Sequence, residues 1–72
     1  MIRVTKLNKK EEFYINPELI ETIEMTPDTV ISLTTQKKFI VAENIDELLE
    51  RIVDYYRIVN SVPPQIVFNP RN

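Results

Sequence analysis

The chain has 72 residues, of which 43% are hydrophobic, and it carries a formal net charge of −2 at pH 7. This length suits one domain with a single small core, and the hydrophobic content is too high for a disordered chain. The absence of cysteine and histidine excludes disulfides, thiolate metal sites and histidine-based catalysis, and the acidic balance argues against nucleic-acid binding.

Five short runs rich in Ile, Val, Thr and Phe are typical of β-strands. They cover residues 2–7, 12–15, 20–25, 29–34 and 38–42. Between the second and third runs, Asn16 followed by Pro17 and Glu18 is a helix-start signal, which predicts one helical or 3₁₀ turn. The fifth run is apolar on both faces, so we expect it to be central or covered on both sides.

Tight turns between these strands must be made without glycine, which the chain lacks. Glycine usually occupies turn positions that need a positive φ, and asparagine is the next most tolerant residue. We therefore expect Asn8 to take the left-handed conformation in the first turn, and Thr35 or Gln36 in the second. The lack of glycine also excludes glycine-rich phosphate loops.

A helix is predicted over residues 45–60, because Asn44 and Glu47 have the spacing of a capping box and an apolar stripe follows. The stripe consists of Ile45, Leu48, Leu49, Ile52, Val53, Tyr56 and Val59. Ile58 falls on the opposite, polar side, while Tyr55 and Val62 lie at the edge of the stripe. The two prolines at 63 and 64 end the helix.

These elements predict an α+β fold, mainly β. We expect a five-stranded antiparallel sheet or small open barrel with the helix across one face, formed by residues 1–62, and an extended tail over residues 63–72. Residues 65–69 read as strand-like, and open sheet edges invite an added strand. We expect Ile66 and Phe68 to place this segment on a sheet edge, either of the same chain or of a neighbouring copy. The stiff link of two prolines favours a neighbouring copy and hence a homo-oligomer.

The sequence predicts no catalytic, cofactor-binding or metal-binding residues. Acidic clusters at 11–12, 21 and 24, and 46–50 fit solvated turns and faces better than catalytic pairs. Lysine pairs at 9–10 and 37–38 would make a basic patch only if both turns lay at one end of the sheet. The candidates for protein interaction are instead an exposed apolar strip of Tyr55, Ile58 and Val62, together with Ile66 and Phe68 of the strand-like segment.

No apolar run approaches the roughly 20 residues that a membrane-spanning helix needs. No charged segment followed by an apolar one opens the chain, as it would in a signal peptide. These features predict a cytoplasmic protein without membrane insertion.

Several segments together resemble the FlbD/SwrD family of small bacterial flagellar proteins, over about residues 1 to 60. They are Leu7-Asn8, Phe13-Tyr14-Ile15-Asn16-Pro17-Glu18-Leu19-Ile20-Glu21, Ile23-Glu24, Thr26-Pro27-Asp28-Thr29-Val30-Ile31, Leu33-Thr34 and Lys37-Lys38-Phe39-Ile40-Val41. The Pro-Asp-Thr turn between two strands is the most specific of these. The family has glycine in both hairpins, where this chain has Lys9 and Gln36.

The resemblance implies a cytoplasmic, non-enzymatic motility accessory protein that acts on flagellar motor, basal-body or export components near the membrane. It brings no catalytic residues. The alternative is a small nucleic-acid-binding regulator, since some short β proteins followed by a helix bind RNA or DNA. The acidic balance opposes that alternative, while the two lysine pairs leave it open.

Overall fold

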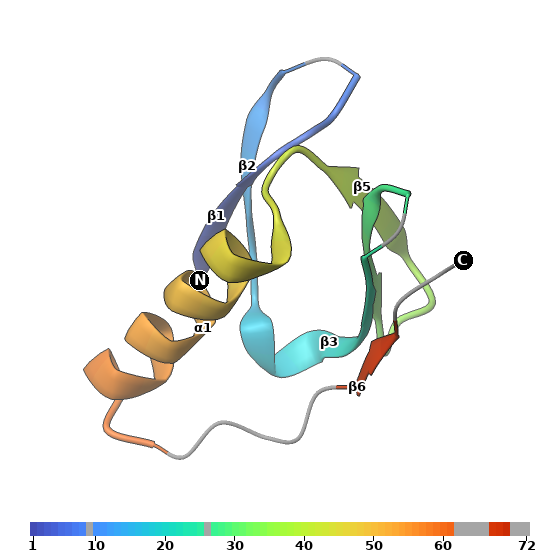
Figure 1. Ribbon diagram of the computed structural model, residues 1–72. Coiled ribbons are helices and arrows are strands. Elements are labelled where there is room, and N and C mark those ends of the chain that lie inside the picture. Colours follow the sequence, from blue (N-terminus) through green and yellow to red (C-terminus); the bar gives the residue numbers. More distant parts are fainter. Residues whose placement is uncertain (9, 26, 62–66, 70–72) are drawn as a thin grey trace.

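The computed structural model describes residues 1–8, 10–25, 27–61 and 67–69 (Figure 1). The elements are β1 (Ile2–Thr5), β2 (Glu12–Ile15), the 3₁₀ helix η1 (Pro17–Leu19), β3 (Ile20–Glu24), β4 (Thr29–Leu33), β5 (Lys38–Val41), α1 (Ile45–Ile58) and β6 (Val67–Asn69). The five predicted strands, the 3₁₀ turn and the helix are confirmed, and their predicted ends are up to two residues too long. The class, mainly strands with one helix after them, is also confirmed.

The strands form two sheets, so the expectation of one five-stranded sheet, flat or curved into an open barrel, is wrong. One sheet pairs β1 with β2, and the other has the order β5-β4-β3-β6, in which β6 runs parallel to β3. The division arises at η1, because its 3₁₀ turn redirects the chain after β2, so that β3 starts a new ladder. The sheets meet at one bridge between Lys6 and Val41.

β4 is one of the two inner strands of the four-stranded sheet, and all five of its residues are buried. The expectation that β5 would be central or doubly covered is wrong, because β5 ends the four-stranded sheet and its Ile40 is exposed. Only one face of β5 is covered: Val41 lies in the core, and the ring of Phe39 packs 5.0 Å from that of Phe13. Apolar residues on both faces of β5 were therefore not a reliable sign of a central strand.

The first turn of α1 is fixed by the predicted capping box. The side chain of Asn44 accepts a bond from the Glu47 N–H at 2.9 Å, and the Glu47 carboxylate accepts one from the Asn44 N–H at 3.1 Å. The helix ends at Ile58, and Asn60, just beyond the cap residue Val59, has a φ of 56° that lets Ser61 N–H reach the carbonyl of Tyr56 at 2.9 Å. This is the Schellman arrangement that stops a helix.

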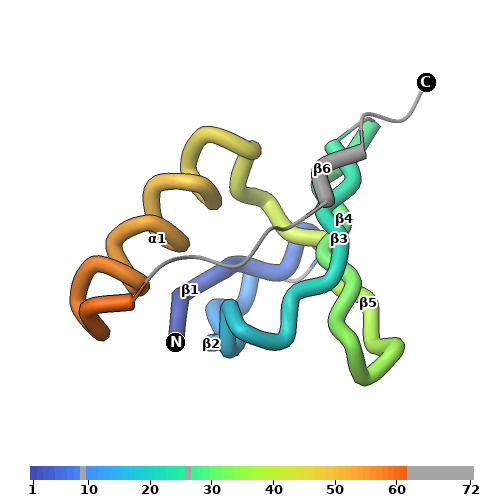
Figure 2. Tube along the Cα trace, turned by 90° about the horizontal axis from the view of Figure 1, so that it is seen from below, coloured from blue at the N-terminus to red at the C-terminus, as the bar shows by residue number. Residues whose placement is uncertain are grey.

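The core is built from both sheets and one face of the helix. Its buried members are Ile2, Val4, Ile15, Ile20, Ile23, Ile31, Leu33, Val41, Leu48, Ile52 and Tyr56. The predicted apolar stripe is wider than the face that docks, because Leu49, Val53 and Val59 remain substantially exposed. The helix lies alongside a narrow hairpin, with β1 between α1 and β2 (Figure 2). A two-stranded sheet offers too little surface to cover the whole stripe.

Three non-glycine residues have positive φ among those described: Lys10 at 54°, Gln36 at 72° and Asn60 at 56°. The prediction for Gln36 is confirmed, and that for Asn8 is wrong. The first hairpin closes with bonds from Lys6 N–H to the carbonyl of Glu11 and from Lys10 N–H to the carbonyl of Lys6. That longer turn moves the left-handed residue to its far end.

Candidate interaction groove

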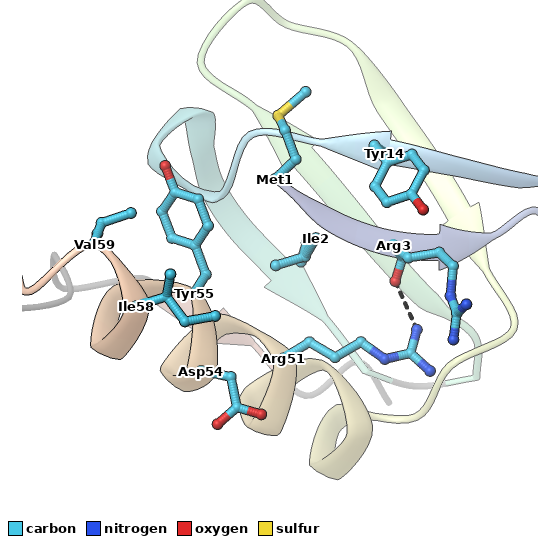
Figure 3. Close-up of a pocket in the computed structure, with 9 residues that line it drawn as sticks. All are labelled: Met1, Ile2, Arg3, Tyr14, Arg51, Asp54, Tyr55, Ile58 and Val59. Atoms are coloured by element: carbon cyan, nitrogen blue, oxygen red, sulfur yellow. Dashed lines mark hydrogen bonds between the residues drawn. The ribbon is translucent and has the colours of Figure 1, made fainter.

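An open groove of about 560 Å³ lies between the C-terminal half of α1 and the start of the β1–β2 hairpin (Figure 3). We call it the hairpin–helix groove. It is lined by Met1, Ile2, Arg3, Tyr14, Arg51, Asp54, Tyr55, Ile58 and Val59. The hairpin supplies the first four of these residues, and the helix supplies the other five.

Large apolar side chains are unusually exposed in this groove. Ile58 is 83% exposed, Met1 64% and Tyr14 63%. Ile58 comes from the helix, whereas Met1 and Tyr14 come from the hairpin, so two elements contribute to one surface (Figure 3). Contiguous exposed apolar side chains framed by polar residues are typical of places where another molecule binds.

Tyr55 forms part of the helix wall and is held in place by two contacts. Its hydroxyl donates a 2.9 Å hydrogen bond to Oε2 of Glu18, and its ring meets that of Tyr56 edge-on at 5.1 Å. The hydrogen bond to the Glu18 carboxylate raises the pKa of the Tyr55 phenol, so this side chain stays neutral at physiological pH. The groove wall is therefore preorganised.

A partly buried ion pair lies at the Arg51 end of the groove. Nη1 of Arg51 donates to Oε2 of Glu43 at 2.8 Å and to the carbonyl of Arg3 at 2.6 Å. Glu43, only 6% exposed, also accepts bonds from the backbone N–H and the hydroxyl of Thr5, both at 2.9 Å. The carboxylate therefore has three donors around it.

These bonds determine the charge of Glu43. Burial alone would raise the pKa of its carboxyl, but the bonds from Thr5 and Arg51 outweigh that effect and lower the pKa below its ordinary value. The pair is thus ionised, and Arg51 is oriented by Glu43. Sequence reasoning missed this cluster, because Thr5 and Glu43 are 38 positions apart and neither stands in a local motif.

The five predicted interaction residues do not all lie in the groove. Tyr55 and Ile58 line the groove, as does Tyr14, which was not among the residues predicted from the sequence. Val62 and Ile66 lie outside the described residues. Phe68 is in β6, where its backbone is in register with that of Ile23, and its side chain is outside the description.

The charged candidates from the sequence do not converge. Lys10 lies in the β1–β2 turn, whereas Lys37 and Lys38 lie at the β4–β5 turn, and Figure 1 shows these turns at different ends of the molecule, at the top and at the right. Lys9 is outside the described residues. The acidic residues form no group of three or more, within the described part, that could hold a metal ion.

No helix in the described ranges is both long and apolar enough to cross a membrane. In comparisons with known proteins, no curated protein and no solved structure matches the chain. A protein family does match it: the FlbD flagellar and swarming motility proteins, over residues 1–60. This match spans both strands of the hairpin, the whole of α1 and every residue of the groove. The chain therefore belongs to the FlbD family of flagellar and swarming motility proteins.

Proposed function

We propose that this chain is a non-enzymatic accessory protein of flagellar motility, which acts by binding proteins of the motor, basal body or export apparatus. The observation that carries the proposal is the hairpin–helix groove, where Ile58 and Tyr14 expose apolar surface from two different elements. Family membership indicates the process, which is flagellar motility. The groove is a surface through which the chain can bind other proteins in that process.

The polar groups of the groove support binding rather than catalysis. Arg51 is held by Glu43 and by the carbonyl of Arg3, and Asp54 lies 3.4 Å from Nη1 of Arg57. Each of these charges already has a partner within the chain. Such groups can orient a bound protein, whereas general acid or base catalysis needs a group that faces the ligand and can donate or accept a proton with a suitable pKa.

The proposed place of action is the cytoplasmic side of the flagellar base. There, a small domain with an apolar groove can reach the cytoplasmic faces of motor and export components. Aromatic and aliphatic residues such as Tyr55 and Ile58 are the kind of side chains that anchor protein interfaces, and anchors carry most of the binding energy.

The proposal is tested by complementing a strain that lacks the gene and measuring swimming and swarming. Ile58→Ser should abolish the rescue while the melting temperature changes little, because the Ile58 side chain is almost fully in solvent. Val53→Ser is the matched control, since Val53 is a partly exposed apolar residue of α1 outside the groove. It should rescue motility as the wild type does.

A second readout is capture of flagellar proteins from cell extract by the tagged wild-type chain, with loss of capture for Ile58→Ser. Full rescue of motility by a folded Ile58→Ser variant would contradict the groove as the working surface. A deletion strain with normal motility would contradict the proposed function as a whole.

A further inference from the structure

The outer edge of β2 is an open sheet edge. The carbonyl of Glu11 accepts a bond from Lys6 N–H, so the odd-numbered residues of β2 that follow bond to β1 in the same way. The backbone N–H and C=O groups of Glu12 and Tyr14 therefore point away from β1, and within the described part of the chain they have no backbone partner. Asn16 continues the extended backbone, with φ −85° and ψ 113°, so its N–H points outward as well.

The outer edge of β1, in contrast, is closed. Arg51 donates to the carbonyl of Arg3. The N–H of Thr5 donates to Glu43, and its carbonyl accepts from Ala42 N–H at 2.8 Å. The helix lies on this side of the hairpin, with β1 between α1 and β2 (Figure 2). The bare edge of the hairpin is therefore that of β2, on the side away from the helix.

We infer that two copies of this chain pair antiparallel along β2, about a two-fold axis at Tyr14, and join their hairpins into one sheet of order β1-β2-β2-β1. The N–H of each Tyr14 then bonds to the carbonyl of the other, and each Asn16 N–H bonds to the carbonyl of Glu12 in the other copy. The inference deepens the proposed function by naming the form in which the chain binds its partners, and it rests on the proposal that the chain acts by binding protein.

The side chains along this edge are complementary to themselves about Tyr14. Residues equally far from Tyr14 on either side meet in the pair, so Glu12 faces Asn16 of the other copy. The amide nitrogen of Asn16 donates no hydrogen bond within the described residues, and it can donate to that carboxylate. Lys10, just before β2, comes close to Glu18 in η1 of the other copy. Both are exposed and opposite in charge, so the two ends of the interface attract.

The contacts that these carboxylates already make leave room for the new ones. Nε of Arg3 lies 3.7 Å from Oε2 of Glu12, in a pair whose side chains are 53% and 59% exposed. The Tyr55 hydroxyl donates to Oε2 of Glu18, and Oε1 of Glu18 has no donor within the described part of the chain. A carboxylate accepts bonds at both oxygens. A donor from a second copy can therefore be added without breaking either contact.

Other antiparallel registers of two copies fit this edge less well. Centring the pair on Glu12 opposes the two Glu12 carboxylates, and centring it on Ile15 opposes Glu12 and Glu18. Like charges directly opposite each other are destabilising. Centring the pair on Phe13 opposes Lys10 with an uncharged residue. A foreign strand would have to carry the complementary pattern of a base, an amide and two acids at these positions, whereas β2 of a second copy carries it already.

The proposed pair presents its binding grooves together. The two-fold axis of an antiparallel strand pair is perpendicular to the sheet, so any feature on one face of the hairpin appears twice on that same face of the joined sheet. The hairpin–helix groove, which Tyr14 lines, is such a feature. The pair can thus bind a partner that repeats its binding site through both grooves at once, which raises the overall affinity without any new kind of contact.

The pair is expected to be weak. A ladder over residues 12–16 buries much less surface than a stable interface needs, and interfaces of that size are transient. We expect a dissociation constant on the order of 0.1–1 mM, so the chain is a monomer at about 10 µM and pairs as its concentration approaches the millimolar range.

NMR and sedimentation of the full chain between about 10 µM and 2 mM test the pairing. The average mass should rise toward that of a dimer with concentration. Amide shifts should move at residues 12–16, and hydrogen exchange at the Tyr14 and Asn16 amides should slow as the pair forms. Added salt should weaken the pairing, because the pairs at both ends are exposed.

Charge variants test the register. Lys10→Glu and Glu18→Lys each bring like charges together at both ends, and each should weaken self-association at least about fivefold at low salt. An equal mixture of the two variants should pair about as well as the wild type, because every contact between them is again between unlike charges. Lys37→Glu is the matched control, since Lys37 is an exposed lysine in the β4–β5 turn. It should stay within about twofold of the wild type.

Several results would overturn the inference. A chain that stays monomeric over the whole range would leave the edge to a foreign strand. Protection confined to α1 or β6 would place the contact elsewhere. Unchanged pairing of Lys10→Glu, or a mixture that pairs no better than either variant alone, would rule out this register. Motility is not a readout, so this inference can fail while the motility function stands.

Discussion

Nη1 of Arg51 lies 2.8 Å from Oε2 of Glu43 and 2.6 Å from the carbonyl oxygen of Arg3. One guanidinium therefore joins the middle of α1 to β1 and to the residue just before the helix cap. Because Glu43 also binds Thr5, the helix and the hairpin are joined by polar bonds as well as by apolar packing. This cluster holds together the two walls of the hairpin–helix groove.

Glu43→Gln should lower the free energy of unfolding at pH 7 by about 1–3 kcal/mol, the range for a hydrogen-bonded charge at a largely buried site. The amide keeps the shape of the side chain but loses the charge that holds Arg51. Glu50→Gln is the control, since Glu50 is exposed on the same helix, and it should change the free energy little. Urea unfolding of the three chains measures the difference, and equal midpoints would mean that the pair contributes nothing.

The same pair predicts a specific pH dependence. The pKa of Glu43 is lowered in the folded chain, so its stabilisation is complete above the ordinary value of 4.5 and is lost as pH falls through the folded value. The stability gap between wild type and Glu43→Gln should therefore be constant near neutral pH and shrink below about pH 4. A gap that persists unchanged at about pH 2 would show that charge is not its source.

Docking of the helix should depend on Leu48 far more than on Leu49. Leu48 is 0% exposed and Leu49 is 39% exposed, although both belong to the predicted apolar stripe. Leu48→Ala should cost about 2–5 kcal/mol of unfolding free energy, which is a large part of the total for so small a domain. Leu49→Ala should cost about 1 kcal/mol or less, since the Leu49 side chain is already partly in water. Melting temperatures of the two variants test this difference, because both replace leucine with alanine at adjacent positions.

Helix prediction from the sequence was good because its signals are local. Asn44 and Glu47 are three residues apart and specify the helix start by themselves. The buried face was less well predicted, because the exposure of Leu49 depends on how much of the narrow hairpin lies opposite. The cluster around Glu43 gave no signal at all, since its burial depends on Thr5 at the other end of the chain.

Gln36→Gly should stabilise the chain by about 1 kcal/mol, because Gln36 has a φ of 72° and a side chain makes that conformation costly. Thr35→Gly is the matched control, as Thr35 lies in the same turn without a positive φ. It should be neutral or destabilising, since glycine adds freedom to the unfolded chain there. Unfolding midpoints in urea measure both, and destabilisation by Gln36→Gly would contradict the assigned turn geometry.

Turn conformations and strand neighbours could be predicted only in part from the local sequence. Gln36 could be predicted from the short second turn, but Lys10 rather than Asn8 takes positive φ because the first turn is longer. Likewise, β5 has the residues of a central strand and yet lies at an edge of the four-stranded sheet. The neighbours of a strand depend on how all the strands pair, and not on its own residues. The backbone groups of Glu12 and Tyr14 point away from β1 because of which residue pairs of the hairpin are hydrogen-bonded. Residue types do not encode that alternation.

Tyr56→Phe should leave the chain as stable as the wild type at pH 7, or more stable by up to about 1 kcal/mol. The Tyr56 hydroxyl is buried and has no hydrogen-bond partner among the described residues, so its removal relieves an unsatisfied polar group. Tyr55→Phe is the informative comparison, because it deletes the hydroxyl that binds Glu18 and should be mildly destabilising. Thermal melts compare the two variants, and marked destabilisation by Tyr56→Phe would reveal a partner for its hydroxyl.

Alkaline pH gives Tyr56 a second test. Burial, assisted by the charge of Glu18, raises the pKa of its phenol above the ordinary 10.0. Stability is therefore complete below pH 10 and falls as pH rises toward the folded pKa, because the unfolded chain releases the proton first. The wild type should lose more stability between pH 7 and about pH 11 than Tyr56→Phe does. Equal losses would argue against burial of this hydroxyl.

Truncation after Ser61 should lower the melting temperature without changing the mass of the chain in solution. The backbone of β6 pairs in parallel with β3 of the same chain, in the register Thr22–Val67 to Glu24–Asn69. Removing it leaves β3 as a bare edge and takes away its ladder hydrogen bonds, each worth about 0.5–1.5 kcal/mol net. The sequence favoured a neighbouring copy as acceptor, whereas the structure has the strand on its own sheet.

Light scattering and melting of the full and truncated chains at one concentration separate these alternatives. A chain that pairs β6 within itself remains monomeric in both forms and loses only stability. A mass that falls on truncation would mean that the strand is exchanged between copies, since exchange of an identical element is a low-cost route to a dimer. β6 would pair with β3 in the same register whether it came from the same copy or from another. The mass in solution, and not the strand pairing, therefore distinguishes a monomer from an exchanged dimer.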